Sequence, residues 1–439
     1  MKKSLLALAA LGAFAGSAQA QSSVTVYGII DAGFLSTNAT NGGANANGTA
    51  AVAASADGAT AAVGSAAGSA NGGKRVTSSL NSGMLSTSRL GFRGVEDLGG
   101  GTRASFVAEI GLSVTGNGFS GSTNNASSPM GTGYVHNSAV LDNRQTFVGL
   151  SQKGLGEARI GRQYTPVHEA MCGTNAGGCN AVAGDMIYSG ANSTNGYVPA
   201  NLIGVAAQIR ASNSIRFATE NISGFQAVAL MSVNNLQNEN SANTSMVTQA
   251  GQGSTNYRLW GANVSYSGVK NLDIRFSQQT TSLNRDNVVA TAISRTVLGN
   301  SMVEAIPAGT QAIARIEQKD TYGNISYDFG PAKVALQHVA LKVTTAGAQS
   351  ARRFANQVAV SAPVSKTISA WASYGQGKIQ AATNAQDFKF DGMQLGTIYN
   401  LSKRTNLYAI YGQAGQDAVI GQASKYKDQQ YALGVRHSF

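Results

Sequence analysis

The side chains of this sequence that could perform metal or nucleophilic chemistry are few and widely separated. Its four histidines are too scattered to form a recognised catalytic dyad or metal-binding motif; they are His136, His168, His338 and His437. A glycine pattern at residues 116–121 fits a dinucleotide fingerprint, but no strand–helix–strand setting surrounds it, so we interpret it as a flexible loop. We therefore expect no enzymatic activity, no bound metal and no cofactor.

The two cysteines are the exception, because they lie close together. Cys172 and Cys179 stand in a single stretch rich in Gly and Asn. In an oxidising, exported setting such a pair favours a local disulfide. A metal pair is the weaker alternative, since the neighbouring His168, Glu169 and Asp185 lack a recognised zinc spacing.

The N-terminus indicates that the protein is exported. Lys2 and Lys3 form the basic start of a secretory signal, residues 5–15 its apolar run, and residues 18–20 its small-residue cleavage site. We expect residues 1–20 to be cleaved and residues 21–439 to form one domain. The net charge of +11 in an exported protein does not indicate nucleic acid. Charges scattered singly along strands favour an electric field within a wall or channel.

The elements that must position these side chains are short strands. The chain has 53 Gly but only 6 Pro, and no long stretch repeats its apolar residues every 3.6 positions. Apolar and polar residues instead alternate, as they do where Leu272, Ile274 and Phe276 are interleaved with polar neighbours. Sixteen such strands are expected, at residues 24–35, 88–94, 104–109, 147–151, 158–163, 214–219, 225–233, 257–266, 272–279, 322–329, 333–342, 354–361, 368–374, 393–401, 407–412 and 431–439.

Short and long connections alternate between these strands. Tight turns are expected at sites such as Leu98-Gly99-Gly100-Gly101, and polar segments of ten or more residues separate the hairpins. Residues 36–82 are expected to form a long flexible external loop, because residues 41–73 are almost purely Ala, Gly, Asn and Ser. An even strand number with short turns opposite long loops is typical of an all-β, antiparallel transmembrane barrel of the outer membrane.

The last strand shows the alternation most clearly. Tyr431, Leu433, Val435 and Phe439 share an apolar face, while the opposite face is small or charged. Alone, this stretch could be an ordinary half-buried edge strand of a soluble sheet. The same alternation of an apolar and a polar face is repeated along the chain. This repetition favours a closed barrel, which leaves no exposed strand edge.

Several segments, spread over the whole mature chain, carry a family resemblance. They include Ser88-Arg89-Leu90-Gly91-Phe92-Arg93-Gly94, Asn143-Arg144-Gln145-Thr146-Phe147-Val148-Gly149-Leu150, Gly161-Arg162-Gln163-Tyr164-Thr165-Pro166 and Gly434-Val435-Arg436-His437-Ser438-Phe439. With these segments the chain resembles the trimeric general diffusion porins of Gram-negative outer membranes, especially the branch related to neisserial porins.

The resemblance implies a homotrimer of sixteen-stranded barrels with short periplasmic turns, long external loops and a third loop that folds into the pore. That loop corresponds to residues 164–209. It also implies contact with membrane lipid and lipopolysaccharide, and passage of small ions and solutes. The terminal residues Tyr431, Leu433, Val435 and Phe439 would be the signal read by the outer-membrane assembly machinery.

In such porins, wall arginines face acidic residues of the inward loop across the constriction. Matched residue by residue, the arginines are Arg89, Arg144 and Arg210. The acidic Pro-Glu-Phe-Gly-Gly run of enterobacterial relatives is absent, and the loop offers only Glu169 and Asp185. This balance predicts a positive constriction and anion preference. The alternative is that the arginines are ordinary solvated residues of the wall.

The sequence thus predicts a passive diffusion channel of the outer membrane for small hydrophilic solutes and ions, with anion preference. A substrate-selective porin is the alternative. A surface or adhesive structural protein is the weaker alternative, because it would concentrate informative residues in its outer loops, and here those loops are the least informative part.

Overall fold

The computed structural model describes residues 23–40, 74–115, 143–188, 209–236, 255–289, 293–297, 300–304, 311–345, 348–381, 387–417 and 426–439. The expected signal peptide, residues 1–20, lies outside these ranges, as do residues 41–73 of the expected external loop. Among the residues described, no helix is both long and apolar enough to cross a membrane.

Most of the described chain is β-strand, and α2 (Pro166–Thr174) is its principal helix. The first strands are β1 (Ser23–Thr40), β2 (Lys74–Ser82), β3 (Arg89–Gly99), β4 (Thr102–Gly111), β5 (Asn143–Gln152), β6 (Gly156–Tyr164), β7 (Arg210–Thr219), β8 (Phe225–Leu236), β9 (Thr255–Tyr266) and β10 (Leu272–Val289). They are followed by β11 (Ile293–Val297), β12 (Asn300–Glu304), β13 (Gln311–Asp328), β14 (Lys333–Thr345), β15 (Ala348–Pro363), β16 (Ile368–Ala381), β17 (Phe388–Asn400), β18 (Thr405–Gln416) and β19 (Tyr426–Ser438).

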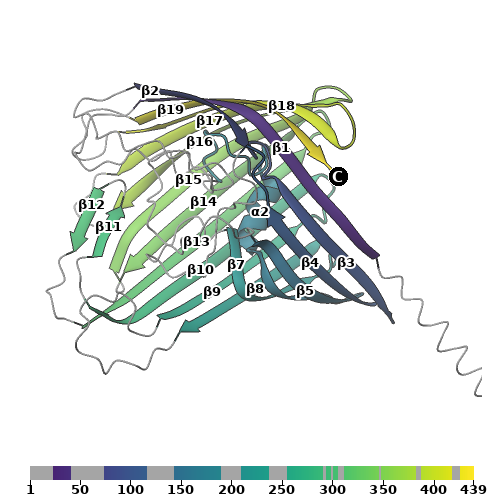
Figure 1. Ribbon diagram of the computed structural model, residues 1–439, viewed down its shortest axis with the longest axis horizontal. Coiled ribbons are helices and arrows are strands. Elements are labelled where there is room, and N and C mark those ends of the chain that lie inside the picture. Colours follow the sequence, from purple (N-terminus) through teal and green to yellow (C-terminus); the bar gives the residue numbers. More distant parts are fainter. Residues whose placement is uncertain are drawn as a thin grey trace, which may run out of the picture.

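The strands close into a barrel (Figure 1). From β3 to β10, and then from β13 to β19, each described strand pairs antiparallel with the next, and β10 pairs with β13. The ends of the series meet where β1 pairs with β19, from Ile29 opposite Ser438 to Thr40 opposite Lys427. β11 and β12 form a separate two-stranded sheet.

β2 and β3 together occupy one position beside β1. β3 pairs with residues 23–29 of β1, and β2 pairs with residues 32–40. The seventeen strands of the described sheet therefore fill sixteen positions. The predicted sixteen-stranded antiparallel barrel is confirmed, and each predicted segment overlaps one of these strands.

Several strands extend well beyond their predicted ends. β10 and β13 each have 18 residues and pair from Leu272 opposite Tyr327 to Val289 opposite Gln311. The expected loop at residues 36–82 likewise begins within β1 and ends with β2. These extensions are mostly polar, and apolar residues do not alternate regularly along them. The ladder continues there because strand pairing uses backbone groups, which every residue except proline offers in full.

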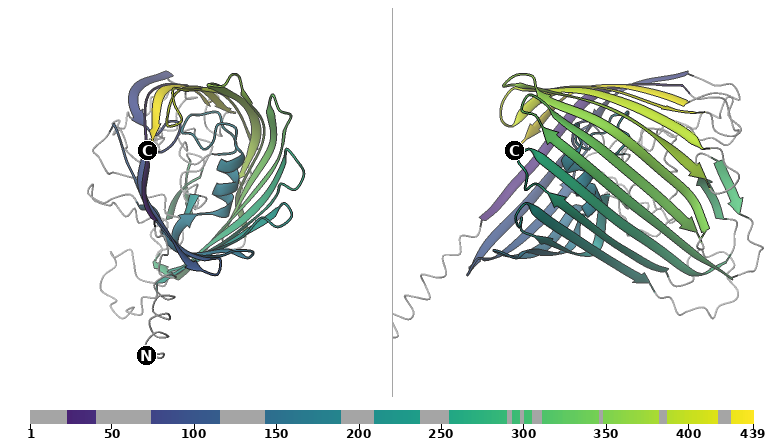
Figure 2. Two further views of the ribbon diagram at one scale, coloured as in Figure 1. Left: turned by 90° about the vertical axis from the view of Figure 1, so that its right-hand side faces the viewer. Right: turned by 180° about the vertical axis from the view of Figure 1, so that it is seen from behind.

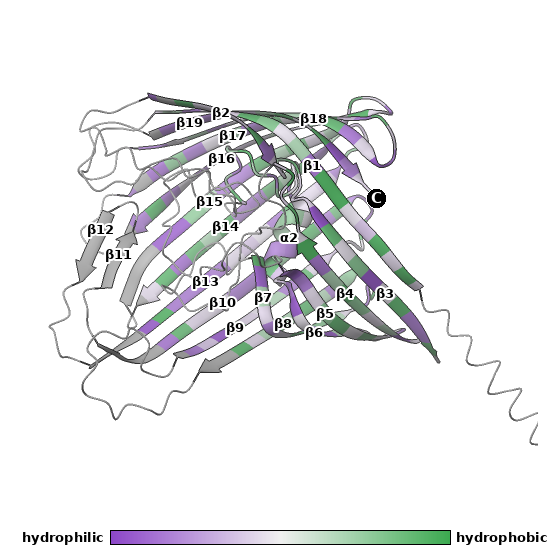
Figure 3. Ribbon diagram, in the orientation of Figure 1, coloured by the Kyte–Doolittle hydropathy of each residue, from purple (hydrophilic) through white to green (hydrophobic). Residues whose placement is uncertain are grey.

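Alternating exposure explains why these sequences form a barrel wall. In β19, Leu433 is 58% exposed and its neighbour Ala432 only 1%. The same alternation appears as interleaved hydrophobic and hydrophilic bands along most strands (Figure 3). Apolar side chains point outward, while polar ones such as Gln430 and Asp428 point into the interior. Because lipid offers no hydrogen bonds, only a closed sheet of this kind can satisfy its backbone there.

The segment after β6 folds into the barrel, where α2 lies (Figure 2). Thr165 caps the helix, its Oγ1 accepting a hydrogen bond from the backbone N–H of His168 at 3.2 Å, and Pro166 occupies the first turn. Val167, Ala170 and Met171 are buried against Tyr322 and Val339 of the wall. This apolar contact fixes the face of α2 that remains turned toward the lumen.

Residues 175–188 continue along the inside of the wall and are held by polar side chains. Gln394 Nε2 donates to the carbonyl oxygens of Val182 and Ala183, both at 3.1 Å. Gln430 Oε1 accepts from the backbone N–H of Ala183 at 2.9 Å. Arg353 Nη2 donates to the carbonyl oxygen of Met186 at 2.7 Å. A loop inside a barrel needs such partners, because a buried backbone without them costs free energy.

Candidate functional site

A cavity of about 450 Å³ lies inside the barrel beside α2. Residues of the inward segment form one part of its lining: His168, Glu169, Cys172, Gly177, Cys179 and Tyr188. Four arginines, at positions 89, 144, 210 and 436, come from the wall. Trp371 of β16 and Ile398 of β17 add an apolar patch. The cavity thus lies between the arginine-bearing part of the wall and the inward segment.

Three of these arginines stand at the same end of alternate strands. Arg89 is the first residue of β3, Arg144 the second of β5 and Arg210 the first of β7. Arg144 and Arg210 are each 4% exposed, and the side chain of Arg89 is 21% exposed. The structure therefore brings together the three arginines that the sequence predicted for a constriction.

Glu109 and Tyr164 connect the arginines. Arg144 Nε donates to Glu109 Oε1 at 2.8 Å, and its Nη2 donates to the hydroxyl of Tyr164 at 2.7 Å. Arg89 Nη1 lies 3.9 Å from Glu109 Oε2. The Arg210 guanidinium lies over the Tyr164 ring, 5.1 Å from its centroid. These contacts hold long, flexible side chains in one cluster.

Glu109 was not among the predicted site residues. It lies on β4, between β3 and β5, and also accepts a hydrogen bond from the Tyr27 hydroxyl at 3.2 Å. Its position in the strand was the feature of the sequence that could have identified it. Residues 106 and 109 fall on opposite faces of a strand, and Phe106 is exposed on the outside. This alternation places a carboxylate on the inner face, between two of the predicted arginines.

The positive charge of the cluster exceeds its negative charge. Arg216 Nη2 donates to Glu169 Oε2 at 2.8 Å, so the one acidic residue of α2 that lines the cavity is paired with a further wall arginine. His168 does not add charge at neutral pH. Burial, reinforced by the charges of Arg210 and Arg144, holds the pKa of His168 well below the usual value of 6.5.

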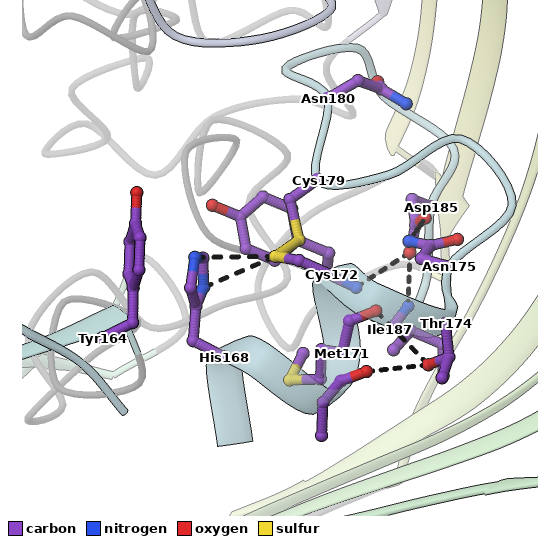
Figure 4. Close-up of a disulfide and its surroundings, with 12 residues drawn as sticks. Tyr164, His168, Met171, Cys172, Thr174, Asn175, Cys179, Asn180, Asp185 and Ile187 are labelled. Carbon is purple, nitrogen blue, oxygen red and sulfur yellow. Dashed lines mark hydrogen bonds between the residues drawn. A yellow bond between two sulfur atoms is a disulfide. The ribbon is translucent and has the colours of Figure 1, made fainter. Parts of the chain in front are cut away.

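A disulfide joins the C-terminal part of α2 to the turn that follows it (Figure 4). It links Cys172 and Cys179, whose Cα atoms are 5.1 Å apart. The two ring nitrogens of His168 lie 3.6 and 3.5 Å from Cys172 Sγ. His168 also stacks on Tyr164, with ring centroids 4.7 Å apart. The disulfide and the imidazole thus form part of the cavity wall beside the arginines.

Residues 7–418 of the chain match the model of the Gram-negative porin family. The chain belongs to that family. It is 29% identical to an outer membrane porin protein of Bordetella pertussis over 451 residues, with both chains fully covered. It is 26% identical to the major outer membrane protein P.IB of Neisseria gonorrhoeae, covering 80% of this chain and 84% of the relative.

Solved structures have the same fold. The anion-selective porin from Comamonas acidovorans superposes with a TM-score of 0.60 and 21% identity, covering 95% of this chain and all of that one. The family and the fold confirm three predictions: an outer-membrane location, a diffusion channel, and the absence of an enzymatic role. The resemblance to porins, including neisserial ones, is confirmed as well.

Asp185 is placed differently from its expected position at the constriction of this porin. Its Oδ1 accepts hydrogen bonds from the backbone N–H groups of Ile187 and Tyr188, both at 2.8 Å, and its Oδ2 contacts the Asn175 amide. It is buried away from the cavity lining, where its carboxylate shapes a turn (Figure 4). Its side-chain oxygens therefore order the inward segment of the porin.

Arg436 is a further porin arginine that the sequence did not assign to the site. It lies on β19, and its Nη1 donates to Ser86 Oγ at 3.2 Å. Ser86 is held in turn by Asp31, whose Oδ2 accepts from the backbone N–H groups of Leu85 and Ser86 at 3.0 and 2.7 Å. The interruption between β2 and β3 is thus fixed inside the barrel. Here too the alternation of the terminal strand could have identified the residue, because it places Arg436 on the inner face.

The predicted assembly residues lie on the outer face of the porin. Tyr431, Leu433 and Val435 are exposed along β19, and Phe439 follows the strand. The backbone N–H of Phe439 donates to Gly28 at 3.1 Å, and Gly28 donates back to Phe439 at 3.0 Å. These bonds complete the seam at which the first and last strands close the barrel.

Proposed function

We propose that this porin is a passive diffusion channel with a preference for anions and a constriction at the cavity beside α2. The convergence of Arg89, Arg144 and Arg210 on this cavity is the observation that carries the proposal. Glu109 bridges two of them, and Glu169 is paired with Arg216, which leaves an excess of positive charge. The similarity to a porin described as anion-selective supports the same conclusion.

The magnitude of this field is sufficient to select ions. A unit charge about 5 Å from a passing ion contributes on the order of 3 kcal/mol at an effective dielectric of about 20. The Debye length at physiological salt is about 8 Å, so screening weakens the field but does not abolish it in a narrow passage. Chloride should therefore enter the constriction at lower free energy than potassium.

Zero-current potentials in planar bilayers test this proposal. The wild-type channel should pass chloride more readily than potassium in a salt gradient. The Arg89→Ser/Arg144→Ser double variant should lower the chloride-to-potassium permeability ratio by about 10-fold, if screening leaves roughly 1.4 kcal/mol, and should raise the conductance by widening the passage.

Arg159→Ser is a suitable control, because Arg159 pairs with Glu157 at 2.6 Å and does not line the cavity. Its reversal potential should match that of the wild type. An unchanged reversal potential in the double variant would mean that Arg89 and Arg144 are ordinary wall residues and that the proposed constriction is wrong.

A substrate-selective porin is the second candidate, and the apolar patch of Trp371 and Ile398 favours it. A selective channel would bind organic anions that carry an apolar part, and they would block chloride current at low concentration. A general channel would show only the weak competition expected from solute size. Chloride conductance measured with added benzoate, and with acetate as the matched smaller anion, separates the two candidates.

We also propose that the porin forms a homotrimer through the outer face of β3 to β6. These strands have only 9–11 residues, whereas β10 and β13 have 18. Their outer face contains an apolar groove of about 510 Å³, lined in part by Val24, Phe106, Val148, Leu150 and Ile160. A second copy of the chain would cover this groove, and the remaining apolar wall would face lipid and lipopolysaccharide.

Charged substitutions test the trimer face. Val148 and Ile160 are 62% and 60% exposed, and Leu336 on the long wall is 57% exposed. Val148→Arg/Ile160→Arg should abolish the heat-resistant oligomer on native gels while the folded monomer persists. Leu336→Arg carries a similar membrane cost of about 2–4 kcal/mol and should leave the oligomer intact. Loss of the oligomer in Leu336→Arg alone would place the interface elsewhere.

A further inference from the structure

Three side chains that can ligate metal meet at the surface of the cavity. His168 and Cys172 stand four residues apart on α2, so they lie on one face of the helix, and Cys179 reaches the same point from the following turn (Figure 4). A ring nitrogen of His168 and the two sulfurs all lie within 4.8 Å of one another. All three residues line the cavity.

The distance between His168 and Cys172 is close to that found in a tetrahedral metal site. With bonds of about 2.0 Å to nitrogen and about 2.3 Å to sulfur, tetrahedral angles separate the two ligand atoms by about 3.5 Å. The two ring nitrogens of His168 lie 3.6 and 3.5 Å from Cys172 Sγ. Because the two nitrogens are almost equally far from the sulfur, Cys172 Sγ lies off the in-plane lone-pair direction of both, so the imidazole must turn about its side-chain bonds before one nitrogen can bind an ion shared with Cys172.

The sulfur of Cys179 also has to move away from that of Cys172. Two sulfurs on one tetrahedral ion are about 3.8 Å apart, whereas a disulfide holds them at about 2.0 Å. Gly177 and Gly178 precede Cys179, and Gly178 has a φ of +63° with open space where a Cβ would stand. Gly177 packs closely against Trp371 and Gln394, and Asn180 Nδ2 donates to Gln394 Oε1 at 2.7 Å, so the separation must come from rotation of the Cys179 side chain and of the backbone at Gly178.

We propose that opening the disulfide creates a site for a thiophilic divalent cation, such as Zn²⁺ or Cd²⁺, held by His168, Cys172 and Cys179. A trialkylphosphine converts the disulfide and one water into two thiols and a phosphine oxide. The two thiols then bind the ion as thiolates and release two protons, while neutral His168 supplies the third ligand. The fourth position faces the lumen and takes a water molecule.

The surrounding charge is compatible with this ion. Arg89, Arg144 and Arg210 line the same cavity and would repel a bare dication, but positive side chains close to a thiol in general favour its thiolate form. Two thiolates neutralise the charge of the ion, so the occupied site adds no net charge to the constriction. The bound ion and its water should therefore obstruct the passage while the remaining current keeps its anion preference.

Direct binding to the reduced porin in detergent is the first test. After phosphine treatment and removal of the reagent, Co²⁺ should give the visible bands of a tetrahedral thiolate complex at one ion per chain, and Zn²⁺ should displace it. Cys172→Ser/Cys179→Ser should show no such bands. His168→Ala should bind at least about 10-fold more weakly, because loss of an outer partner alone costs 10- to 100-fold. His338→Ala removes an exposed histidine of β14 and should bind as the wild type does.

Bilayer recordings provide the second test. Zn²⁺ should lower the conductance of reduced wild-type channels, and a chelator should restore it. Oxidised wild-type channels and the double serine variant should not respond. Heat resistance on gels establishes that each sample contains folded barrel, so loss of binding cannot result from unfolding.

The Co²⁺ spectrum and the channel conductance test the metal site and the proposed channel function independently. The Co²⁺ spectrum does not depend on conduction, so it tests the site even if the ion preference proves different. Octahedral Co²⁺ bands alone, or Zn²⁺ affinity equal to that of the double serine variant, would overturn the proposal. Stoichiometric Zn²⁺ without any change in conductance would overturn the placement of the site on the conducting path.

Discussion

At the scale of single residues, the charge of the constriction depends on how many arginines share each carboxylate. Glu109 contacts Arg144 at 2.8 Å and Arg89 at 3.9 Å, so one carboxylate partly compensates two guanidinium groups. In this arrangement the carboxylate belongs to the wall, next to the arginines, and not to a loop on the opposite side of the water-filled passage. The negative charge therefore lies against the wall, and the lumen stays positive.

Replacing this carboxylate should strengthen the anion preference. In Glu109→Gln the arginines lose their partner, so the reversal potential should move further toward that of chloride. Loss of hydrogen bonds to charged groups should also lower the stability of the folded barrel by about 1.5–3 kcal/mol. Reversal potentials and thermal unfolding would measure both effects. Glu157→Gln, which removes an acid outside the cavity lining, should leave the reversal potential unchanged.

The ion preference should not respond to His168 in the mildly acidic range. Because burial and the arginines hold its folded pKa well below 6.5, His168 stays neutral as the pH falls from the alkaline side to that usual value. Reversal potentials of wild type and His168→Gln should therefore follow the same course over this range. A shift of the wild type alone toward stronger anion preference would show that His168 is protonated in the folded channel.

The lowered pKa of His168 should also make the folded porin less stable at acidic pH. Below 6.5 the unfolded chain binds a proton at His168 that the folded chain does not. The contribution of His168 to the free energy of unfolding should thus decrease as the pH falls through 6.5 toward the folded value. Denaturation midpoints of the wild type should fall with acidification more steeply than those of His168→Gln.

At the scale of elements, the inward segment is fixed twice, by the wall and by its own disulfide. Gln394, Gln430 and Arg353 bind its backbone from β17, β19 and β15. The disulfide closes a sequence separation of 7 residues, and in the chain-entropy account such a closure contributes about 2–3 kcal/mol. The wall contacts hold the segment as a whole, while the disulfide restrains the turn at residues 175–179.

Removing both cysteines should therefore loosen the turn without unfolding the barrel. Cys172→Ser/Cys179→Ser should keep its heat resistance and mean conductance, but its open-channel current should become noisier. Mass spectrometry of the unreduced wild type should find Cys172 linked to Cys179. Two free thiols in the exported protein, or loss of the folded barrel in the double variant, would contradict this account.

At the scale of the whole molecule, the seam between β1 and β19 closes the barrel. Its register runs from Ile29 opposite Ser438 to Thr40 opposite Lys427, and Phe439 bonds to Gly28 through both backbone groups. Without this seam both strands would present unpaired backbone groups to lipid, at a cost of several kcal/mol for each group. Closure is thus a condition for the whole fold.

Deleting Phe439 should lower the yield of folded, heat-resistant protein in the outer membrane and leave export across the inner membrane intact. The structural reason is the loss of the last bonds to Gly28, and the family resemblance adds the loss of the residue read by the assembly machinery. Phe439→Tyr keeps both the backbone bonds and the aromatic ring, so it should assemble normally. Normal yield of the truncated protein would contradict both roles.

The sequence by itself determined the barrel and the phase of its wall. Alternation has a period of two residues, so Leu433 and Ala432 of β19 could be assigned to opposite faces from their order alone. The strand number followed from counting such segments. Arg89 and Arg144 could be placed from the motifs that contain them, and the disulfide from two cysteines in one flexible stretch.

Only the tertiary structure decided which charges meet. Glu109 joins Arg89 and Arg144 through the stagger of three neighbouring strands, and alternation does not specify that stagger. Asp185 and Glu169 looked equivalent in sequence, yet the first binds the backbone N–H groups of its own turn and the second reaches Arg216. Strand pairing and loop folding set these partners, because they bring together residues that are distant along the chain.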